Sequence, residues 1–299
     1  MKEKNNHPVQ AKRKKVADYR SFLMNQHIVF GTFMAIIHLF ALFALQPKFW
    51  NFASLITFLI LYWLTLCLGI TLGYHRLLAH KSFEVPIWLE RFFATCGLLA
   101  IQGGPIDWCG VHRMHHSFSD LDGDPHNSKL GFWYCHFAWI LDTPAAKKRH
   151  HIIPNYSADL VKNPYYRFIN KKGLLFQIPI GLSLFLIGKS LNVDPWSLIL
   201  WGIPLRIVAG FHATWLVNSA AHIWGSVEFN SKDFSKNNKW VALLTFGEGW
   251  HNNHHAFPSS SKHGLLKNQI DLTWQHIRFL ANIGLAKKIK LPNKIIYNN

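Results

Sequence analysis

Acidic side chains are scarce in this chain of 299 residues, in which 15 Asp and Glu stand against 32 Lys and Arg. A net charge of +17 would fit a protein that binds nucleic acid. However, only 16% of the residues are charged at all, while 49% are hydrophobic. This balance is typical of a membrane protein whose loops are rich in Lys and Arg. The hydrophobic runs described below favour the membrane protein, so we expect no nucleic-acid partner.

Cysteine is scarce as well, and no two cysteines form a Cys-x-x-Cys pair. All four lie in or beside apolar stretches, which gives no sign of a disulfide framework and fits a reducing compartment. The first residues, MKEKNNHPVQAKRKK, also lack the apolar core and the cleavage site of a signal peptide. We expect residues 1–26 to form a disordered basic tail in the cytosol. The four cysteines are Cys67, Cys96, Cys109 and Cys135.

Four apolar stretches, the third completed by its flanks, are long enough to cross a bilayer, which takes about 20 residues. They cover about residues 28–45, 52–72, 174–190 and 196–217, and short turns join them into two helical hairpins. A further run at 92–101 would reach only about 15 Å as a helix, so we expect it to be re-entrant, interfacial or buried. The sequence therefore predicts an all-α membrane protein with four transmembrane helices.

The distribution of positive charge fits this topology. Of the 32 Lys and Arg, 29 lie in the N-terminal tail and in the segments 73–172 and 218–299. The positive-inside rule places these segments, and both termini, in the cytosol. We expect residues 27–299 to form one integral-membrane domain whose two polar segments build a cytosolic helical cap. Arg206, inside the fourth span, either has a functional role, lies near a helix end or pairs internally.

Near the C-terminus, apolar residues recur at helical spacing from Ile270 to Leu285. Asp271 is the predicted N-cap of this helix. Because the helix is amphipathic, we expect it to lie on the membrane face or to close the cytosolic cap, two roles that do not exclude each other.

Histidines gather in three short motifs, HRLLAH at 75–80, HRMHH at 112–116 and HNNHH at 251–255. The second and third motifs use the spacing i, i+3, i+4, which puts their rings on one face of a helix. The first motif uses i, i+5, about 140° apart, and needs a kink or two different metals. Imidazole is a common metal ligand, and one zinc takes about four ligands, so eight rings predict two metals. The eight are His75, His80, His112, His115, His116, His251, His254 and His255.

A fourth motif, NSAAH at 218–222, adds His222 as a ninth candidate, with Asn218 one helical turn earlier as a holder of metal-bound water. Nearby carboxylates either accept the second N–H of the ligating rings or are solvated loop acids. These are Asp107, Asp120, Asp124 and Glu248. Histidines without such spacing are expected to pack or to support the ligands: His126, His136, His212, His263 and His276, with His38 either a ligand or packed.

A site made of nitrogen ligands suits iron, copper or zinc, and the spacing alone does not choose among them. Zinc would indicate hydrolysis, whereas iron would permit O2 activation and attack on an unactivated C–H bond. Because the motifs follow the ends of the spans, an alkyl chain reached from the membrane is the natural substrate. A histidine-lined metal transporter would need its ligands at mid-membrane, where none of the motifs lies.

The order HRLLAH, HRMHH, NSAAH, HNNHH resembles that of the membrane fatty acyl Δ9-desaturases, especially the bacterial and cyanobacterial ones. Supporting matches are GITLGYHR at 69–76, DGDPHNS at 122–128 and FGEGWHNNHHAFP at 246–258. The resemblance runs from about residue 30 to 290. It implies a di-iron centre held by all nine histidines named above, with Asn218 acting through a water. It also implies that O2 and two electrons form a cis Δ9 double bond in a stearoyl or palmitoyl chain.

The resemblance further implies an active site on the cytoplasmic face of a bacterial plasma or thylakoid membrane. No fused cytochrome b5 domain is expected, because both termini are short, so the electron donor would be a separate ferredoxin or cytochrome b5. Gln102 and Trp108 match the family's substrate-binding pattern. A hydroxylase with the same motifs is the closest rival, and a zinc membrane hydrolase is a more distant one.

Two further expectations concern the acyl substrate. Trp63 lies twelve residues before His75, about 18 Å deeper along a helix, and is either the floor of the acyl tunnel or an ordinary packing residue. Animal acyl-CoA desaturases carry an Arg-Asp pair directly before the second motif, and that pair contacts CoA. Gly110 and Val111 stand there in this chain. We therefore favour acyl chains esterified in membrane glycerolipid over acyl-CoA.

Overall fold

The computed structural model describes residues 29–142 and 151–292. Within these two ranges every regular element is a helix, and β-pairing is limited to isolated bridges. Three helices are long and apolar enough to cross a membrane: Phe52–Ala79, Gly173–Ser190 and Pro195–Ile223. The first predicted span corresponds to the shorter apolar helix Val29–Ala44. The predicted basic tail, 1–26, lies outside the described residues.

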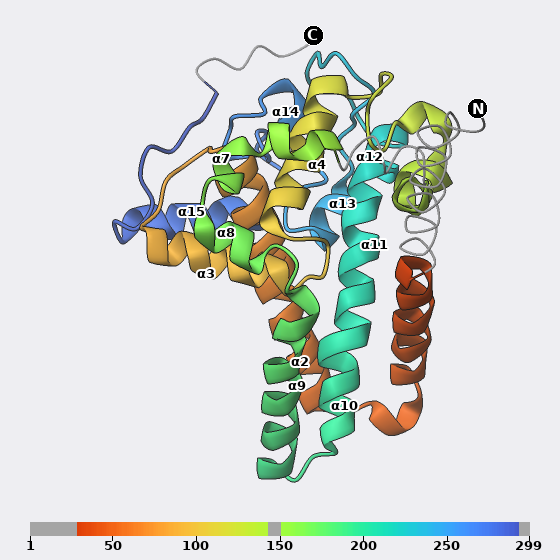
Figure 1. Ribbon diagram of the computed structural model, residues 1–299. Coiled ribbons are helices and arrows are strands. Elements are labelled where there is room, and N and C mark those ends of the chain that lie inside the picture. The colour runs from red at the N-terminus through yellow and green to blue at the C-terminus, as the bar shows by residue number, and fades with distance from the viewer. Residues whose placement is uncertain (1–28, 143–150, 293–299) are drawn as a thin grey trace, which may run out of the picture.

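The long apolar helices extend together to one side of the molecule, with Val29–Ala44 beside them, and most of the shorter helices form a cap at one end (Figure 1). Two of the three are composite. One joins α2 (Phe52–Tyr62) to the π-helix η2 (Trp63–Ala79). The other joins α10 (Pro195–Leu200), η5 (Trp201–Leu205), α11 (Arg206–Asn218) and α12 (Ala220–Ile223), while α9 (Gly173–Ser190) is continuous.

The cap is built from short helices that flank the histidine motifs. Two of them, α3 (Ile87–Leu98) and α15 (Leu272–Asn282), lie across the ends of the spanning helices (Figure 1). The others are α4 (Pro105–Phe118), η3 (Ser128–Leu130), η4 (Tyr134–Ala138), α5 (Trp139–Leu141), α7 (Ala158–Val161), α8 (Pro164–Ile169), α13 (Lys239–Leu244) and α14 (His251–Ala256). By contrast, η1 (Pro47–Phe49) lies in the first hairpin turn, beside α10 at the other end of the spanning helices (Figure 1).

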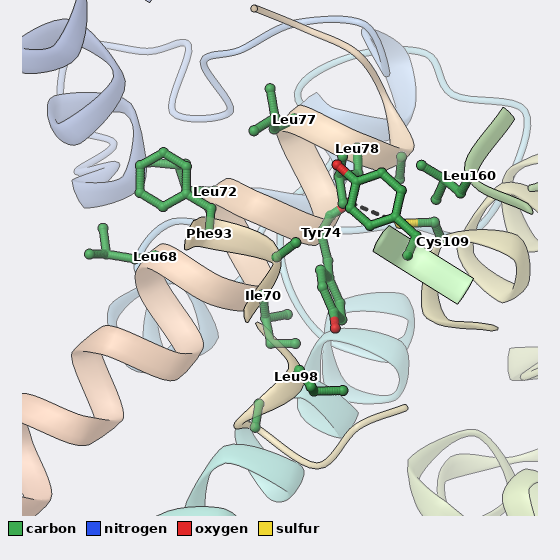
Figure 2. Packing of buried hydrophobic residues seen from close by; sticks show 14 of the residues in the cluster. Leu68, Ile70, Leu72, Tyr74, Leu77, Leu78, Phe93, Leu98, Cys109 and Leu160 are labelled. Carbon is green, nitrogen blue, oxygen red and sulfur yellow. Dashed lines mark hydrogen bonds between the residues drawn. The ribbon is translucent and has the colours of Figure 1, made fainter. Parts of the chain in front are cut away.

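The packing of α3 against η2 determines on which side the histidine motifs lie. Gly69 and Gly73 let the two backbones approach, since a Cβ on Gly69 would overlap the backbone of Cys96 and Gly97. Phe93 and Leu98 of α3 then join the buried core around η2 and α4 (Figure 2). With 12 residues, α3 is not among the helices long enough to span. Between the first and the second histidine motif, the structure therefore shows no helix long enough to cross a membrane.

The predicted C-terminal helix is present, with its predicted cap. The Asp271 carboxylate accepts a hydrogen bond from the backbone N–H of Trp274 at 2.9 Å. The same helix is tied to η2, because Thr273 and Thr71 hydroxyls lie 2.6 Å apart. Its opposite face leaves Phe279 and other apolar side chains exposed. The helix thus packs against η2 on one face and presents an apolar face outward.

We predict that Gly69→Ala destabilises the fold by about 1–3 kcal/mol, because the added methyl group must push apart two backbones. The matched control is Gly181→Ala on α9, where a Cβ would make an ordinary 3.5 Å contact with Ile203. The thermal unfolding midpoint of the detergent-solubilised protein measures the effect. Equal midpoints for the two variants would contradict the close approach of η2 and α3.

Candidate metal centre

The structure brings the nine candidate histidines into two adjacent groups. In each group, the ligand nitrogens lie within 4.8 Å of one another. The groups touch, since the rings of His116 and His255 are 4.5 Å apart between centroids. The first group contains His75, His80, His112, His116 and His254, and the second contains His115, His222, His251 and His255.

Each triplet motif is divided between the two groups. On a helix, residues i and i+4 are about 40° apart, while i+3 points about 60° to the other side of i. Accordingly α4 directs His112 and His116 into the first group and His115 into the second. The helix α14 does the reverse, with only His254 in the first group. Two opposite divisions of this kind build two sites from two copies of one spacing.

The first motif reaches one site through a π-helical turn. The backbone N–H of His80 donates to the carbonyl of His75 at 3.0 Å, a bond from i to i−5. Such a turn places residues five apart on the same face, which an α-helix does not. The two rings accordingly lie 4.9 Å apart. The sequence left open a kinked helix or two different metals for the i, i+5 spacing. The structure has a distorted helix, and both rings belong to the first group.

Carboxylates fix the orientation of the rings. An aspartate that accepts a hydrogen bond from Nδ1–H leaves the lone pair of that imidazole on Nε2. Three such pairs are His115 with Asp124 at 2.9 Å, His222 with Asp120 at 3.1 Å and His255 with Asp233 at 2.5 Å. In a fourth, Nδ1 of His75 lies 2.6 Å from Glu248. These carboxylates orient rings in both groups.

The Nε2 atoms face one another at distances that call for a cation. They lie 2.7 Å apart between His80 and His112, and 3.1 Å apart between His222 and His251. Burial lowers the pKa of His112 and of His251 well below the usual range, and neighbouring imidazoles lower it further. These two rings are therefore neutral at pH 7, and a neutral imidazole can offer its lone pair to a metal ion. A metal ion that accepts these lone pairs fits the donor set.

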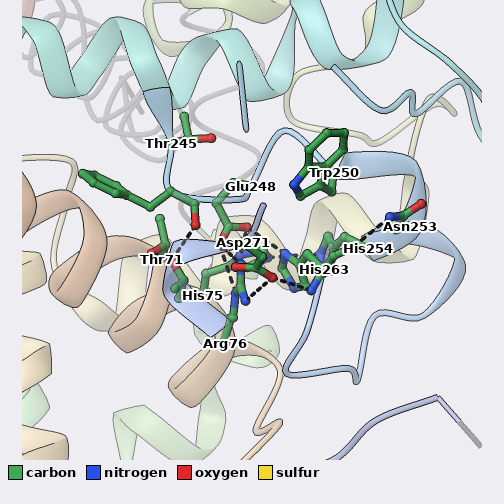
Figure 3. Close-up of polar contacts among 12 residues, drawn as sticks. Thr71, His75, Arg76, Thr245, Glu248, Trp250, Asn253, His254, His263 and Asp271 are labelled. Carbon is green, nitrogen blue, oxygen red and sulfur yellow. Dashed lines mark hydrogen bonds and ion pairs between the residues drawn. The ribbon is translucent and has the colours of Figure 1, made fainter. Parts of the chain in front are cut away.

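A buried polar network holds Glu248 beside the first group (Figure 3). Arg76 is fully buried and donates to Glu248 at 3.1 Å and to Asp271 at 2.9 Å. The second carboxylate oxygen of Glu248 faces His75 and lies 3.2 Å from Nδ1 of His263. This arrangement links the first motif, the loop before α14 and the cap of α15. It therefore keeps one carboxylate fixed although it is removed from water.

The sequence identified three of the four orienting carboxylates as alternatives, and it missed Asp233. That residue lies 22 positions before His255, with no spacing that ties it to a motif. The sequence could have pointed to Asp233 through the scarcity of acids. With only 15 Asp and Glu in the chain, each one is a candidate hydrogen-bond partner for a histidine. Asp107, also considered, instead accepts a hydrogen bond from the side chain of Asn170 at 2.9 Å. His263, expected to pack or to support, contacts Glu248.

Two cavities lead along the histidine groups. One of about 240 Å³ is lined by Gln102, Trp108, His112, Thr214 and Asn218, among others. A second, of about 40 Å³, shares Trp108, His112, Thr214 and Asn218 and continues toward the apolar wall of η2. The Trp108 ring lies against His112 with centroids 5.2 Å apart. A narrow, largely apolar space thus runs past both groups.

The remaining predicted substrate residue lies elsewhere. Trp63 lines neither of the two cavities, and its indole N–H donates to His276 of α15 at 3.1 Å. Its role as a tunnel floor stays a prediction. By contrast Gln102 lies at the larger cavity, where its amide donates to the Thr214 hydroxyl at 2.9 Å. The wall at this point is therefore built by hydrogen-bonded side chains from two elements.

Comparison with known proteins agrees with this arrangement. A family model described as fatty acid desaturase matches residues 53–285. The chain belongs to the fatty acid desaturase family. The desaturase is 48% identical over 260 residues to a protein of Synechocystis sp. named sn-1 stearoyl-lipid 9-desaturase, an alignment that covers 87% of this chain and 79% of the relative.

Two other relatives are of similar closeness. An Anabaena variabilis protein, also named sn-1 stearoyl-lipid 9-desaturase, is 47% identical, with 86% of this chain and 92% of the relative covered. An Arabidopsis thaliana protein named palmitoyl-monogalactosyldiacylglycerol delta-7 desaturase, chloroplastic, is 46% identical, with 89% and 70% covered. The relatives thus share the family while their names differ in the position of the double bond.

We predict that Asp233→Ala lowers the metal affinity of the second group about 10- to 100-fold, because the His255 ring loses the acceptor that orients it. Metal retained by the purified protein across a series of chelator concentrations measures this. Glu228→Ala is the control, since Glu228 lies in the same loop and its carboxylate accepts a hydrogen bond from Ser226 rather than from a histidine of either group. Identical retention in both variants would contradict the orienting role.

Proposed function

We propose that this desaturase introduces a cis Δ9 double bond into saturated stearoyl or palmitoyl chains, using two iron ions and O2. The observation that carries the proposal is the convergence of nine imidazoles, in two touching groups, beside a largely apolar cavity. Iron bound there would supply the redox chemistry that activates O2. One O2 becomes two waters, taking two hydrogen atoms from the chain and two electrons with two protons from the donor.

The residues of the chain act by positioning the substrate. The acyl chain occupies the two connected cavities, so that its middle carbons pass His112 and Asn218. Trp108 and the Gln102–Thr214 pair form the wall at this point. A rigid wall of this kind selects the carbons that react and excludes water from them. Asn218 would hold a metal-bound water, and its position in the lining of both cavities supports this role.

We further propose four membrane helices, with the cap and both termini in the cytoplasm and residues 27–299 forming one integral domain. The concentration of Lys and Arg outside the apolar helices supports this orientation. Electrons then arrive from a separate ferredoxin or cytochrome b5 on the cytoplasmic side. A bacterial plasma or thylakoid membrane is the proposed location.

The packing at Gly110 supports a glycerolipid substrate over acyl-CoA. A Cβ built on Gly110 would lie 2.6 Å from the Ile153 side chain and 2.9 Å from the Ile153 carbonyl oxygen. The segment that contains Ile153 therefore occupies the place where a CoA-contacting Arg would project. A lost charge-assisted hydrogen bond to CoA would cost about 1.5–3 kcal/mol. The names of two cyanobacterial relatives, which specify a stearoyl-lipid substrate, agree with this proposal.

The metal proposal predicts about two irons per chain in protein purified without chelator. His222→Ala and His115→Ala should each reduce alkene formation to background, because each removes one of four ligands of the second group. His276→Ala on α15 is the control and should remain active. One zinc without iron, an alcohol as the product, or an active His222→Ala variant would contradict the proposal.

The carrier proposal predicts that labelled stearoyl-glycerolipid is desaturated directly in membranes that contain the protein, the electron donor and a reductant. Labelled stearoyl-CoA should react only after its acyl group has been transferred to lipid. Blocking acyl transfer and analysing the product in each lipid class separates the two routes. Direct conversion of the CoA ester, with inert glycerolipid, would overturn the carrier and leave desaturation intact.

A further inference from the structure

A guanidinium group lies buried among the membrane helices with only neutral partners. Arg206 opens α11 and is 1% exposed. Its side chain donates to the carbonyls of Gly202 at 3.0 Å and Leu99 at 2.5 Å, and to the side-chain oxygen of Gln177 at 2.9 Å. The intramembrane arginine thus pairs internally. Burying a cation inside a membrane protein is costly, so a buried arginine indicates a structural or functional role.

The main partner of Arg206 is the end of another helix. Leu99 is the C-cap of α3, and carbonyls at a helix C-terminus are left unpaired and carry partial negative charge. Gln177 of α9 donates to the same carbonyl at 3.2 Å. Side chains from two spanning helices therefore donate to the same carbonyl at the C-terminal end of α3. We call Arg206, Gln177 and the Leu99 carbonyl the α3 clamp.

The segment directly after the clamp is strained and forms the cavity wall. Ile101 has φ of 60°, in the left-handed region that a β-branched residue rarely adopts. Such a residue stays there only when both sides are held. The clamp holds the side before it, and the Gln102 side chain, which donates to the Gly210 carbonyl at 3.1 Å, holds the side after it. Ile101 and Gln102 both line the larger cavity.

One helix face connects the clamp to the histidine groups. Arg206, Gly210, Thr214 and Asn218 follow one another at steps of four along α11, so they lie in one row. The row is about 18 Å long. Its first three members hold residues 99–102, and its last two line the cavity beside the histidines. The position of the cavity wall relative to the histidine groups is thus set by one helix, α11.

We propose that the α3 clamp is a specificity-determining device, in which Arg206 positions the cavity wall and so selects the carbon pair that is desaturated. This rests on the proposed desaturation of acyl chains. Shifts of about 1 Å at a reacting centre are enough to change which atoms react. Loosening the clamp should therefore let the acyl chain settle in more than one register against the histidine groups.

The test compares Arg206→Met, Arg206→Lys and Gln177→Leu with the unchanged protein in membranes supplied with donor and reductant. Double-bond positions are determined by mass spectrometry of products from C16 and C18 glycerolipids, together with iron content and protein amount. Arg206→Met and Gln177→Leu should raise the fraction of misplaced double bonds about fivefold or more, as expected when a bond to a charged group is lost. Arg206→Lys keeps a donor and should preserve the position.

Ser197→Ala is the matched control, because it breaks a 2.9 Å bond from Asn51 between α2 and α10, at the far end of the same composite helix. It should leave the product position unchanged. An unaltered position in Gln177→Leu, or an equal change in Ser197→Ala, would overturn the inference, and Gln177→Leu decides if Arg206→Met fails to fold. No alkene from the unchanged protein would instead overturn the proposed function.

Discussion

Nine imidazoles whose ring nitrogens converge in two groups are the constraint on which this structure depends. Without a cation the lone pairs repel one another, and without carboxylates behind them the rings would not keep the required tautomer. Burial makes both conditions stricter, because it disfavours protonation of the rings as an escape from repulsion. Four carboxylates, in a chain that has few acids, accordingly lie within hydrogen-bond distance of Nδ1 atoms of these rings.

Much of the fold can be understood as the means of bringing the rings together. The close approach at Gly69 keeps α3 on one side, so that the first and second motifs meet. The π-turn from His75 to His80 rotates two rings onto one face. Arg76 then ties the first motif to Glu248 and Asp271, which come from much later in the chain. Together these features assemble ligands from four separate segments.

The apolar helices serve a second requirement, which is to deliver a long chain to a polar centre. The two cavities share lining residues and are bounded by aromatic and aliphatic side chains together with histidines of both groups. The wall of the larger cavity includes Ile101, whose backbone is strained, and the buried Arg206 holds the carbonyl of Leu99 two residues earlier. A fully buried cation and a left-handed isoleucine are both unfavourable alone. Their combination gives a wall whose position is well defined.

The sequence by itself determined the helical class, the apolar helices, the C-terminal cap helix and the nine histidines, because helical periodicity and ligand spacing are local properties. Only the tertiary structure decided how the rings divide, since the split of each triplet depends on how α4 and α14 face each other. It also decided the role of Asp233 and Arg206, whose partners lie far away in the chain. Long-range pairings of this kind have no period in the sequence, so they emerge only when the chain is folded.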